Sequence, residues 1–225
     1  MQNPLARFID HTLLKPEATR DDILRLCEEA KTHHFYSVCI HPYWIVDAKK
    51  ALLGTSVKIV TVIGFPHGAS LPQVKAFETT AAIAAGADEI DMVINLGAAE
   101  EKHWDFVEHE IHSVVSAAHG RVVKVILETC LHYPDAVREL CVRAVKAGAQ
   151  FVKTSTGFHQ SGATEEAVRI MRDAVGPTFG VKASGGIRTR EIADKMLAAG
   201  ANRLGCSSSL SILQSTTSPV ERTNY

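Results

Sequence analysis

The chain has 225 residues, a formal net charge of −1 at pH 7 and a hydrophobic fraction of 46%, which fits one large globular domain without a basic field for nucleic acid. It has no apolar run of the roughly 18 residues that a transmembrane helix needs, and its start does not resemble a signal peptide. Five cysteines without a Cys-x-x-Cys pair argue against disulfides and structural zinc. We therefore expect a cytoplasmic protein with no membrane or nucleic-acid partner.

Apolar runs and amphipathic segments alternate along the whole chain. The expected strands are residues 9–12, 35–41, 57–63, 88–95, 122–129, a run from Phe151, a run from Phe179, and 202–206. The expected helices are a short one near the N-terminus, one opening at Thr19, and residues 43–53, 71–85, 100–118, 134–147, 164–175, 189–199 and 207–213.

Strict alternation of strands and helices indicates a parallel sheet. An open doubly wound sheet is one solution, but no Gly-x-Gly-x-x-Gly motif opens the first unit. A closed barrel needs an eighth strand, which residues 9–12 supply, and its typical length is about 250 residues. We therefore predict an α/β fold, a (β/α)8 TIM barrel over residues 1–213 with a short N-terminal helix. The polar residues 214–225 are expected to form a flexible C-terminal tail.

Four charged residues stand in otherwise apolar strands: Asp91, Glu128, Lys153 and Lys182. Lysine is seldom buried without a partner or a function. One interpretation is a structural network in which the four charges neutralise one another. The other is a reactive amine, made neutral by desolvation and by the second lysine, that attacks a carbonyl to form a Schiff base. The pattern alone does not choose between the two lysines.

The loops after the last three expected strands are rich in glycine and serine: Gly157, Gly185, Gly186, Gly205, Ser207 and Ser208. Backbone N–H groups in such loops form the phosphate site common on this barrel, and Arg188 adds positive charge. The histidines on expected helices fit solvated faces, and strand alternation separates Asp88 from Glu89 and Asp91. These patterns predict a phosphate ligand and no metal site.

The residues together resemble the class I deoxyribose-phosphate aldolases, over essentially the whole chain. The motifs that carry the resemblance are residues 9–16, 37–40, 86–95, 123–129, 152–157 and 181–188. The resemblance implies reversible cleavage of 2-deoxy-D-ribose 5-phosphate to D-glyceraldehyde 3-phosphate and acetaldehyde, without a metal or organic cofactor. Fold and phosphate loops alone also permit another Schiff-base aldolase, a phosphosugar isomerase or a non-catalytic sugar-phosphate-binding barrel.

The same resemblance implies roles for individual residues. Lys153 matches the Schiff-base lysine, Lys182 the group that favours its neutral form, and Asp91 the group that moves protons with water. Tyr225 matches a terminal tyrosine that can enter the active site. The matches to the supporting polar network are Asp10, Thr12 and Glu128.

The glycines and serines of the late loops, with Arg188, match the family's phosphate-binding region. Two features depart from the family pattern there, the loop 158–162 and Ser209, and both bear on phosphate affinity. The resemblance also implies a homo-oligomer, with a dimer favoured, that acts on a small sugar phosphate and aldehydes.

Overall fold

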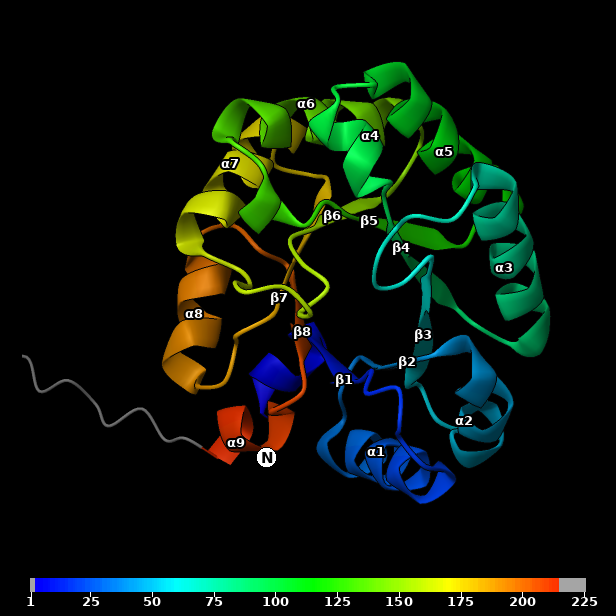
Figure 1. Cartoon of the computed structure of the whole chain (residues 1–225). Helices are drawn as coiled ribbons and strands as arrows, with labels where there is room; N and C mark the ends of the chain where they lie inside the picture. Colours follow the sequence, from blue (N-terminus) through cyan, green and yellow to red (C-terminus); the bar gives the residue numbers. More distant parts are fainter. Residues whose placement is uncertain (1–2, 215–225) are drawn as a thin grey trace, which may run out of the picture.

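The computed structural model describes residues 3–214, so the tail from 215 on and the proposed role of Tyr225 lie outside the described residues. Eight parallel strands form a closed barrel in chain order, ringed by helices (Figure 1). The strands are β1 (Ile9–Leu13), β2 (Ser37–Ile40), β3 (Lys58–Ile63), β4 (Glu89–Val93), β5 (Val122–Ile126), β6 (Phe151–Lys153), β7 (Gly180–Ser184) and β8 (Arg203–Cys206). The predicted (β/α)8 barrel is confirmed, and β1 closes it by pairing with β2 and β8.

Helices connect the strands on the outside of the barrel. They are α1 (Arg20–His33), α2 (Ile45–Ala51), α3 (Pro72–Ala85), α4 (Leu96–Glu100), α5 (Trp104–Ala117), α6 (Pro134–Lys146), α7 (Glu165–Val175), α8 (Arg190–Ala198) and α9 (Ser209–Gln214). Short 3-10 helices occupy Pro4–Phe8, Pro42–Trp44 and Thr129–Leu131. Across the described residues, no helix combines the length and apolar character needed to cross a membrane.

Side-chain caps fix where several helices begin. Thr19 forms a capping box with Asp22, in which each side chain accepts a hydrogen bond from the other's backbone N–H. Thr164 and Thr189 cap α7 and α8 through their hydroxyl oxygens. These bonds satisfy N–H groups that have no partner within the helix, so each of these three helices begins at a defined residue.

Two expected elements differ from the structure at a residue with left-handed backbone geometry. The helix expected to begin at residue 100 begins at Trp104, because Lys102 adopts a left-handed conformation (φ 57°) just before α5. The residues before it form a separate short helix, α4, which Asn95 caps. The strand expected over 122–129 ends at Ile126, because Glu128 is also left-handed (φ 55°). A left-handed residue interrupts both helix and strand geometry, and composition does not reveal it in a non-glycine residue.

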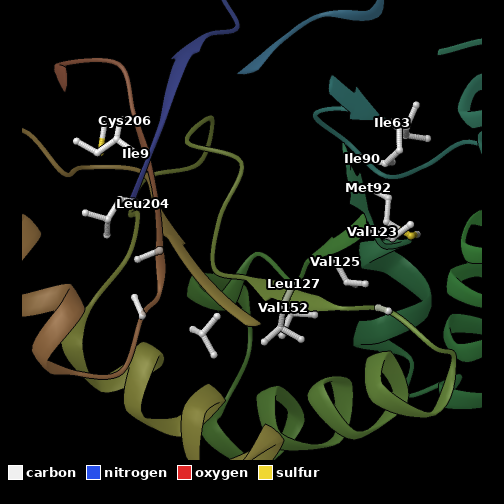
Figure 2. Close-up of a cluster of buried hydrophobic side chains, with 14 of the residues drawn as sticks. Ile9, Ile63, Ile90, Met92, Val123, Val125, Leu127, Val152, Leu204 and Cys206 are labelled. Atoms are coloured by element: carbon white, nitrogen blue, oxygen red, sulfur yellow. The ribbon is translucent and has the colours of Figure 1, made fainter. Parts of the chain in front are cut away.

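Alternation along the strands separates an apolar outer face from a charged interior. Outward side chains pack beneath the helices and form the main core, part of which Figure 2 shows: Ile9, Ile63, Ile90, Met92, Val123, Val125, Leu127, Val152, Leu204 and Cys206. Residues one position away on the same strands, such as Asp10, Asp91 and Lys153, lie on the opposite face. The same two-residue period therefore builds the core and delivers polar groups to the barrel interior.

A buried ion pair between α3 and α5 joins the loops after β3 and β4. The Nζ of Lys75 donates hydrogen bonds to the carbonyl oxygens of Gly68 (2.7 Å) and Val93 (2.8 Å) and to Glu110 Oε1 (2.6 Å). The other carboxylate oxygen of Glu110 accepts the N–H of Asn95 at 2.8 Å. The pair satisfies backbone groups that would otherwise be buried without partners, and it fixes one side of the barrel mouth.

Candidate active site

Asp91, at the middle of β4, is the hub of the charged interior. Its Oδ2 accepts hydrogen bonds from Lys153 Nζ (2.8 Å) and Lys182 Nζ (2.7 Å), and its Oδ1 accepts one from Lys124 Nζ (2.8 Å). All four side chains are buried. Strands β4, β5, β6 and β7 thus bring one carboxylate and three amines together inside the barrel.

A deeper layer of charges supports this hub. Asp10 on β1 accepts hydrogen bonds from Lys182, from Arg203 (3.0 Å) and from Ser37 (2.7 Å). Glu89, two residues before the hub, pairs with Lys124 (2.7 Å) and Arg203 (3.2 Å). The network therefore contains three carboxylates and four cationic groups, so its charges balance when one amine is neutral.

The network holds Asp91 in the charged form. Burial alone would raise the pKa of Asp91, but Lys124, Lys153 and Lys182 together hold that pKa well below its ordinary value. Burial would also lower the pKa of Lys182, yet Asp10 and Asp91 raise it above its ordinary value. Lys182 is therefore a protonated, ion-paired amine and a poor nucleophile.

The stability of the barrel should consequently depend on acid pH. The pKa values of Asp10 and Asp91 are lowered from 3.8 in the folded chain, so their stabilising contribution is complete above that value. It is lost as pH falls through 3.8 towards the lowered pKa, because the unfolded chain then binds protons more readily. We expect the urea midpoint to fall between pH 5 and pH 3. Asp10→Asn should be less stable at pH 6 and show a smaller fall, and equal falls in both proteins would contradict this origin.

A cleft of about 290 Å³ opens above the network, at the carboxyl ends of the strands. Its lining joins Lys153 to the late loops and to the end of β1: Thr12, Leu13, Leu14, Lys15, Thr156, Gly157, Phe158, Ser184, Gly185, Gly186, Ile187, Arg188, Gly205 and Ser207. Of the three amines around Asp91, Lys153 is the one that lines this cleft. The structure therefore places an amine and the predicted phosphate loops in one cavity.

The remaining predicted residues lie around the cleft in different ways. Thr12 lines it, and its hydroxyl donates to the Asp10 carbonyl oxygen at 2.9 Å. Glu128 stabilises the loop after β6. Its Oε2 accepts hydrogen bonds from the backbone N–H (3.1 Å) and the hydroxyl (2.5 Å) of Thr156. Ser208 stands beside the cleft-lining Ser207, at the start of the turn into α9.

The loop 158–162 folds closely onto the predicted phosphate region. A Cβ added to Gly162 would lie 2.1 Å from the Gly185 carbonyl oxygen, so only glycine permits this approach. The ring of Phe158 meets the ring of Phe65 edge to face, with centroids 5.2 Å apart. Figure 1 shows the loop after β6 projecting over the barrel opening, with the loop after β3 on the other side of it. The two loops thus narrow the mouth of the cleft.

A larger hollow of about 510 Å³ lies between β1 and α1, and it includes His11, Arg25 and Glu29. It shares residues such as Thr12 and Ser207 with the lysine cleft but contains no member of the charge network around Asp91. Within residues 3–214, no group of three or more His, Cys, Asp or Glu side chains is arranged to hold a metal ion. The smaller cleft, which contains Lys153, is therefore the candidate active site.

Three members of the network were not predicted: Lys124, Glu89 and Arg203. A signal was present, because Lys124 stands between valines in Val122–Ile126 and so occupies the inward period of a buried strand. Arg203 also packs over the ring of Tyr36, 3.5 Å from the ring centroid, a contact between distant segments. Listing every charged residue on the inward period of the expected strands would have added Lys124, Glu89 and Arg203 to the candidates.

The model for the DeoC/LacD family of aldolases matches residues 5–215. The chain belongs to this family. It is 55% identical to a deoxyribose-phosphate aldolase of Bacillus mycoides (strain KBAB4), over 93% of this chain and 94% of that protein. It is 53% identical to one from Geobacillus sp. (strain WCH70), over 96% and 98% of the two chains. The predicted family and its enzyme class, a carbon–carbon lyase, are confirmed.

Solved structures agree with this assignment to the DeoC/LacD aldolases. A putative deoxyribose-phosphate aldolase from Coccidioides immitis superimposes with a TM-score of 0.90 at 42% identity, over 93% of this chain and 84% of that one. A deoxyribose phosphate aldolase from Aeropyrum pernix, described as tetrameric, gives 0.88 at 37% identity, over 93% and 89% of the two chains. A lysine Schiff base is the general mechanism of the family.

Proposed function

We propose that this aldolase cleaves 2-deoxy-D-ribose 5-phosphate reversibly to D-glyceraldehyde 3-phosphate and acetaldehyde, through a Schiff base on Lys153. The observation that carries the proposal is the shared cavity, in which an amine of the charge network faces loops suited to phosphate. The curated relatives from Bacillus mycoides and Geobacillus carry the name of this activity.

Charge and access favour Lys153 over Lys182 as the nucleophile. Lys182 pairs with both Asp10 and Asp91 and is fully buried, whereas Lys153 pairs with Asp91 and lines the cleft. If Lys153 is the neutral amine, three carboxylates face three cations and the buried charges balance. A neutral amine is the form that attacks a carbonyl.

The proposed reaction uses Lys153 as an electron sink. Its Nζ adds to the aldehyde carbon of the open-chain sugar, and loss of water gives an iminium ion. A base removes the proton of the 3-hydroxyl, the bond between carbons 2 and 3 breaks, and its electrons move into an enamine while glyceraldehyde 3-phosphate leaves. Protonation of carbon 2 and hydrolysis then release acetaldehyde and restore the lysine. Asp91, held anionic 2.8 Å from Lys153, stabilises the iminium charge and moves protons through water.

The late loops are proposed to hold the phosphate of this substrate. The residues are Gly157, Gly185, Gly186, Arg188, Gly205, Ser207 and Ser208. Positive φ angles at Gly157 (85°), Gly185 (83°) and Gly186 (78°) require glycine and allow the backbone to approach a ligand closely. Backbone N–H groups and the exposed guanidinium of Arg188 can then bind the anion.

Arg188→Gln should weaken binding of the phosphorylated sugar without changing the chemistry. We expect KM for 2-deoxy-D-ribose 5-phosphate to rise about tenfold, the value of one charge-assisted hydrogen bond at an exposed site. Cleavage of 2-deoxy-D-ribose, which lacks the phosphate, should keep its kcat/KM. Steady-state kinetics on both sugars measure the difference, and an equal loss on both would place Arg188 outside phosphate binding.

Trapping the Schiff base tests the proposed function directly. The protein is incubated with acetaldehyde, reduced with borohydride and mapped by mass spectrometry, together with an assay of glyceraldehyde 3-phosphate formation. We expect an ethyl group on Lys153. Modification of Lys182 alone would reverse the roles of the two lysines, and a folded protein without a selective adduct would overturn the Schiff-base proposal.

Assembly and compartment are part of the proposal. We infer a cytoplasmic homo-oligomer, with a dimer as the expected form. The five free cysteines support a reducing compartment, and the Aeropyrum pernix relative is described as tetrameric. Light scattering on the purified protein distinguishes monomer, dimer and tetramer.

A further inference from the structure

His11 is a buried, titratable residue that the proposed chemistry does not use. It follows Asp10 on β1 and therefore points out of the barrel, towards α1 and the start of α9. Its side chain is 4% exposed, and its ring lies against Phe35 with centroids 4.8 Å apart. An apolar residue would suit this position, so the polar ring calls for an explanation.

Both ring nitrogens of His11 have polar partners from other elements. Nε2 lies 2.6 Å from Glu29 Oε2 on α1, and Nδ1 lies 2.9 Å from Ser209 Oγ at the first residue of α9. Ser209 Oγ also lies 3.0 Å from the carbonyl oxygen of Cys206, the last residue of β8. The imidazole therefore connects three segments that are distant in the sequence.

The connection holds in both protonation states of the ring. When His11 is neutral, Nε2–H donates to Glu29 and Nδ1 accepts the hydroxyl proton of Ser209. When it is protonated, Nδ1–H donates to Ser209, whose hydroxyl then donates to the Cys206 carbonyl. In each state Glu29 fixes the orientation of the ring, and the ring fixes Ser209.

Ser209 ends the short connection that holds Ser207 and Ser208. The residues at the two ends of this connection, Cys206 and Ser209, are buried, whereas Ser207 within it is exposed and lines the cleft. Ser209 Oγ lies within hydrogen-bond distance of His11 Nδ1 and of the Cys206 carbonyl oxygen. Cys206 itself pairs with His11 in the sheet, so both ends of the connection are held next to β1. A buried side-chain anchor beneath an exposed binding loop limits the positions that the loop can adopt.

We propose that His11 is a positioning residue for the phosphate-binding loop between β8 and α9, acting through Ser209 and oriented by Glu29. The expectation for the sugar phosphate rests on the proposed function. The expectation for inorganic phosphate requires only that this loop binds an anion. It also gives a role to Ser209, which departs from the family pattern.

The test compares Ser209→Ala with two substitutions of His11. The side-chain amide of asparagine lies near the position of Nδ1, which faces Ser209. The amide of glutamine lies near the position of Nε2, which faces Glu29. We expect Ser209→Ala and His11→Gln to weaken binding of inorganic phosphate, measured by titration calorimetry, about threefold to tenfold, as expected for one hydrogen bond. KM for 2-deoxy-D-ribose 5-phosphate should rise by the same factor with kcat within about twofold, and His11→Asn should retain about half of the lost affinity.

Controls separate positioning from general stability. Ser113→Ala removes an exposed hydroxyl that donates to its own helix on α5 and should change neither measurement. The kcat/KM for unphosphorylated 2-deoxy-D-ribose should stay within about twofold in every variant, since the anchor serves the phosphate. The double variant Ser209→Ala/His11→Gln should be no weaker than the worse single variant, because both remove the same link.

Several results would overturn the proposal. Unchanged phosphate affinity in Ser209→Ala would do so even if the His11 variants failed to fold. Equal losses of kcat/KM on both sugars would assign His11 a structural role only. If the wild-type protein binds phosphate but cleaves no sugar, the proposed function fails while the calorimetry still decides the role of His11. If the wild-type protein binds no phosphate, the loop is not an anion site and the inference fails.

Discussion

Lys153→Arg should abolish aldol cleavage and leave the barrel folded. Arginine keeps a positive charge near Asp91 but does not lose a proton at neutral pH, so it cannot form a Schiff base. We expect kcat to fall on the order of 10⁶-fold, the scale seen when a covalent nucleophile is removed. Borohydride trapping with acetaldehyde should give no adduct at position 153, and circular dichroism should show the wild-type spectrum.

The matched control is Lys195→Arg, which makes the same chemical change on the exposed face of α8, where Lys195 pairs with Glu191 at 2.9 Å. It should retain wild-type kcat and the Lys153 adduct. Substantial cleavage by a folded Lys153→Arg protein would disprove the covalent mechanism. The Lys153→Arg protein should still bind phosphate, because the late loops are unchanged.

Asp91→Asn should cost both stability and activity. It removes the carboxylate partner of Lys153, whereas Lys182 keeps Asp10 and Lys124 keeps Glu89. Breaking a buried ion pair of this kind costs about 3 to 5 kcal/mol of unfolding free energy. The loss of a group that moves protons should lower kcat by a further factor of about 10² to 10⁴.

Glu89→Gln provides the comparison within the same network. It also removes a buried carboxylate, but Lys124 keeps Asp91 and Arg203 keeps Asp10. Urea unfolding should show a comparable loss of stability, while kcat of the folded fraction should stay within about threefold of wild type, because Glu89 does not contact Lys153. Parallel losses of kcat in both variants would show that Asp91 acts only as a countercharge.

The sequence predicted the architecture well because the barrel repeats one simple pattern. Eight apolar strands alternate with helices along the chain, and each repeat supports the same interpretation. Residues 9–12 formed the weakest of the expected strands, and the barrel argument rather than local propensity assigned them. Their pairing with both β2 and β8 confirms that assignment.

The partners of each charge could not be predicted in the same way. Lys153, Lys182 and Asp91 were selected as charges in apolar strands. Which charges they meet depends on the register of the barrel strands, which places Asp91 opposite Lys124. Glu128 was expected in the supporting polar network; its carboxylate accepts the hydroxyl of Thr156, and neither this partner nor its left-handed backbone (φ 55°) is evident from its residue type. Local patterns identify which strand carries a charge, and closure of the sheet decides which charges meet.

The charge network also has a consequence for how the chain folds. The partners Asp10 and Lys182 are 172 residues apart, and Asp10 and Arg203 are 193 apart. A growing chain emerging from the ribosome therefore carries Asp10 long before either partner exists. Contacts of such sequence separation carry a loop-closure cost that slows folding, and a barrel without β7 and β8 would leave Asp10 without its cationic partners. We therefore expect the active site to form only when β7 and β8 close the barrel, and chains that end before β8 to lack a stable fold.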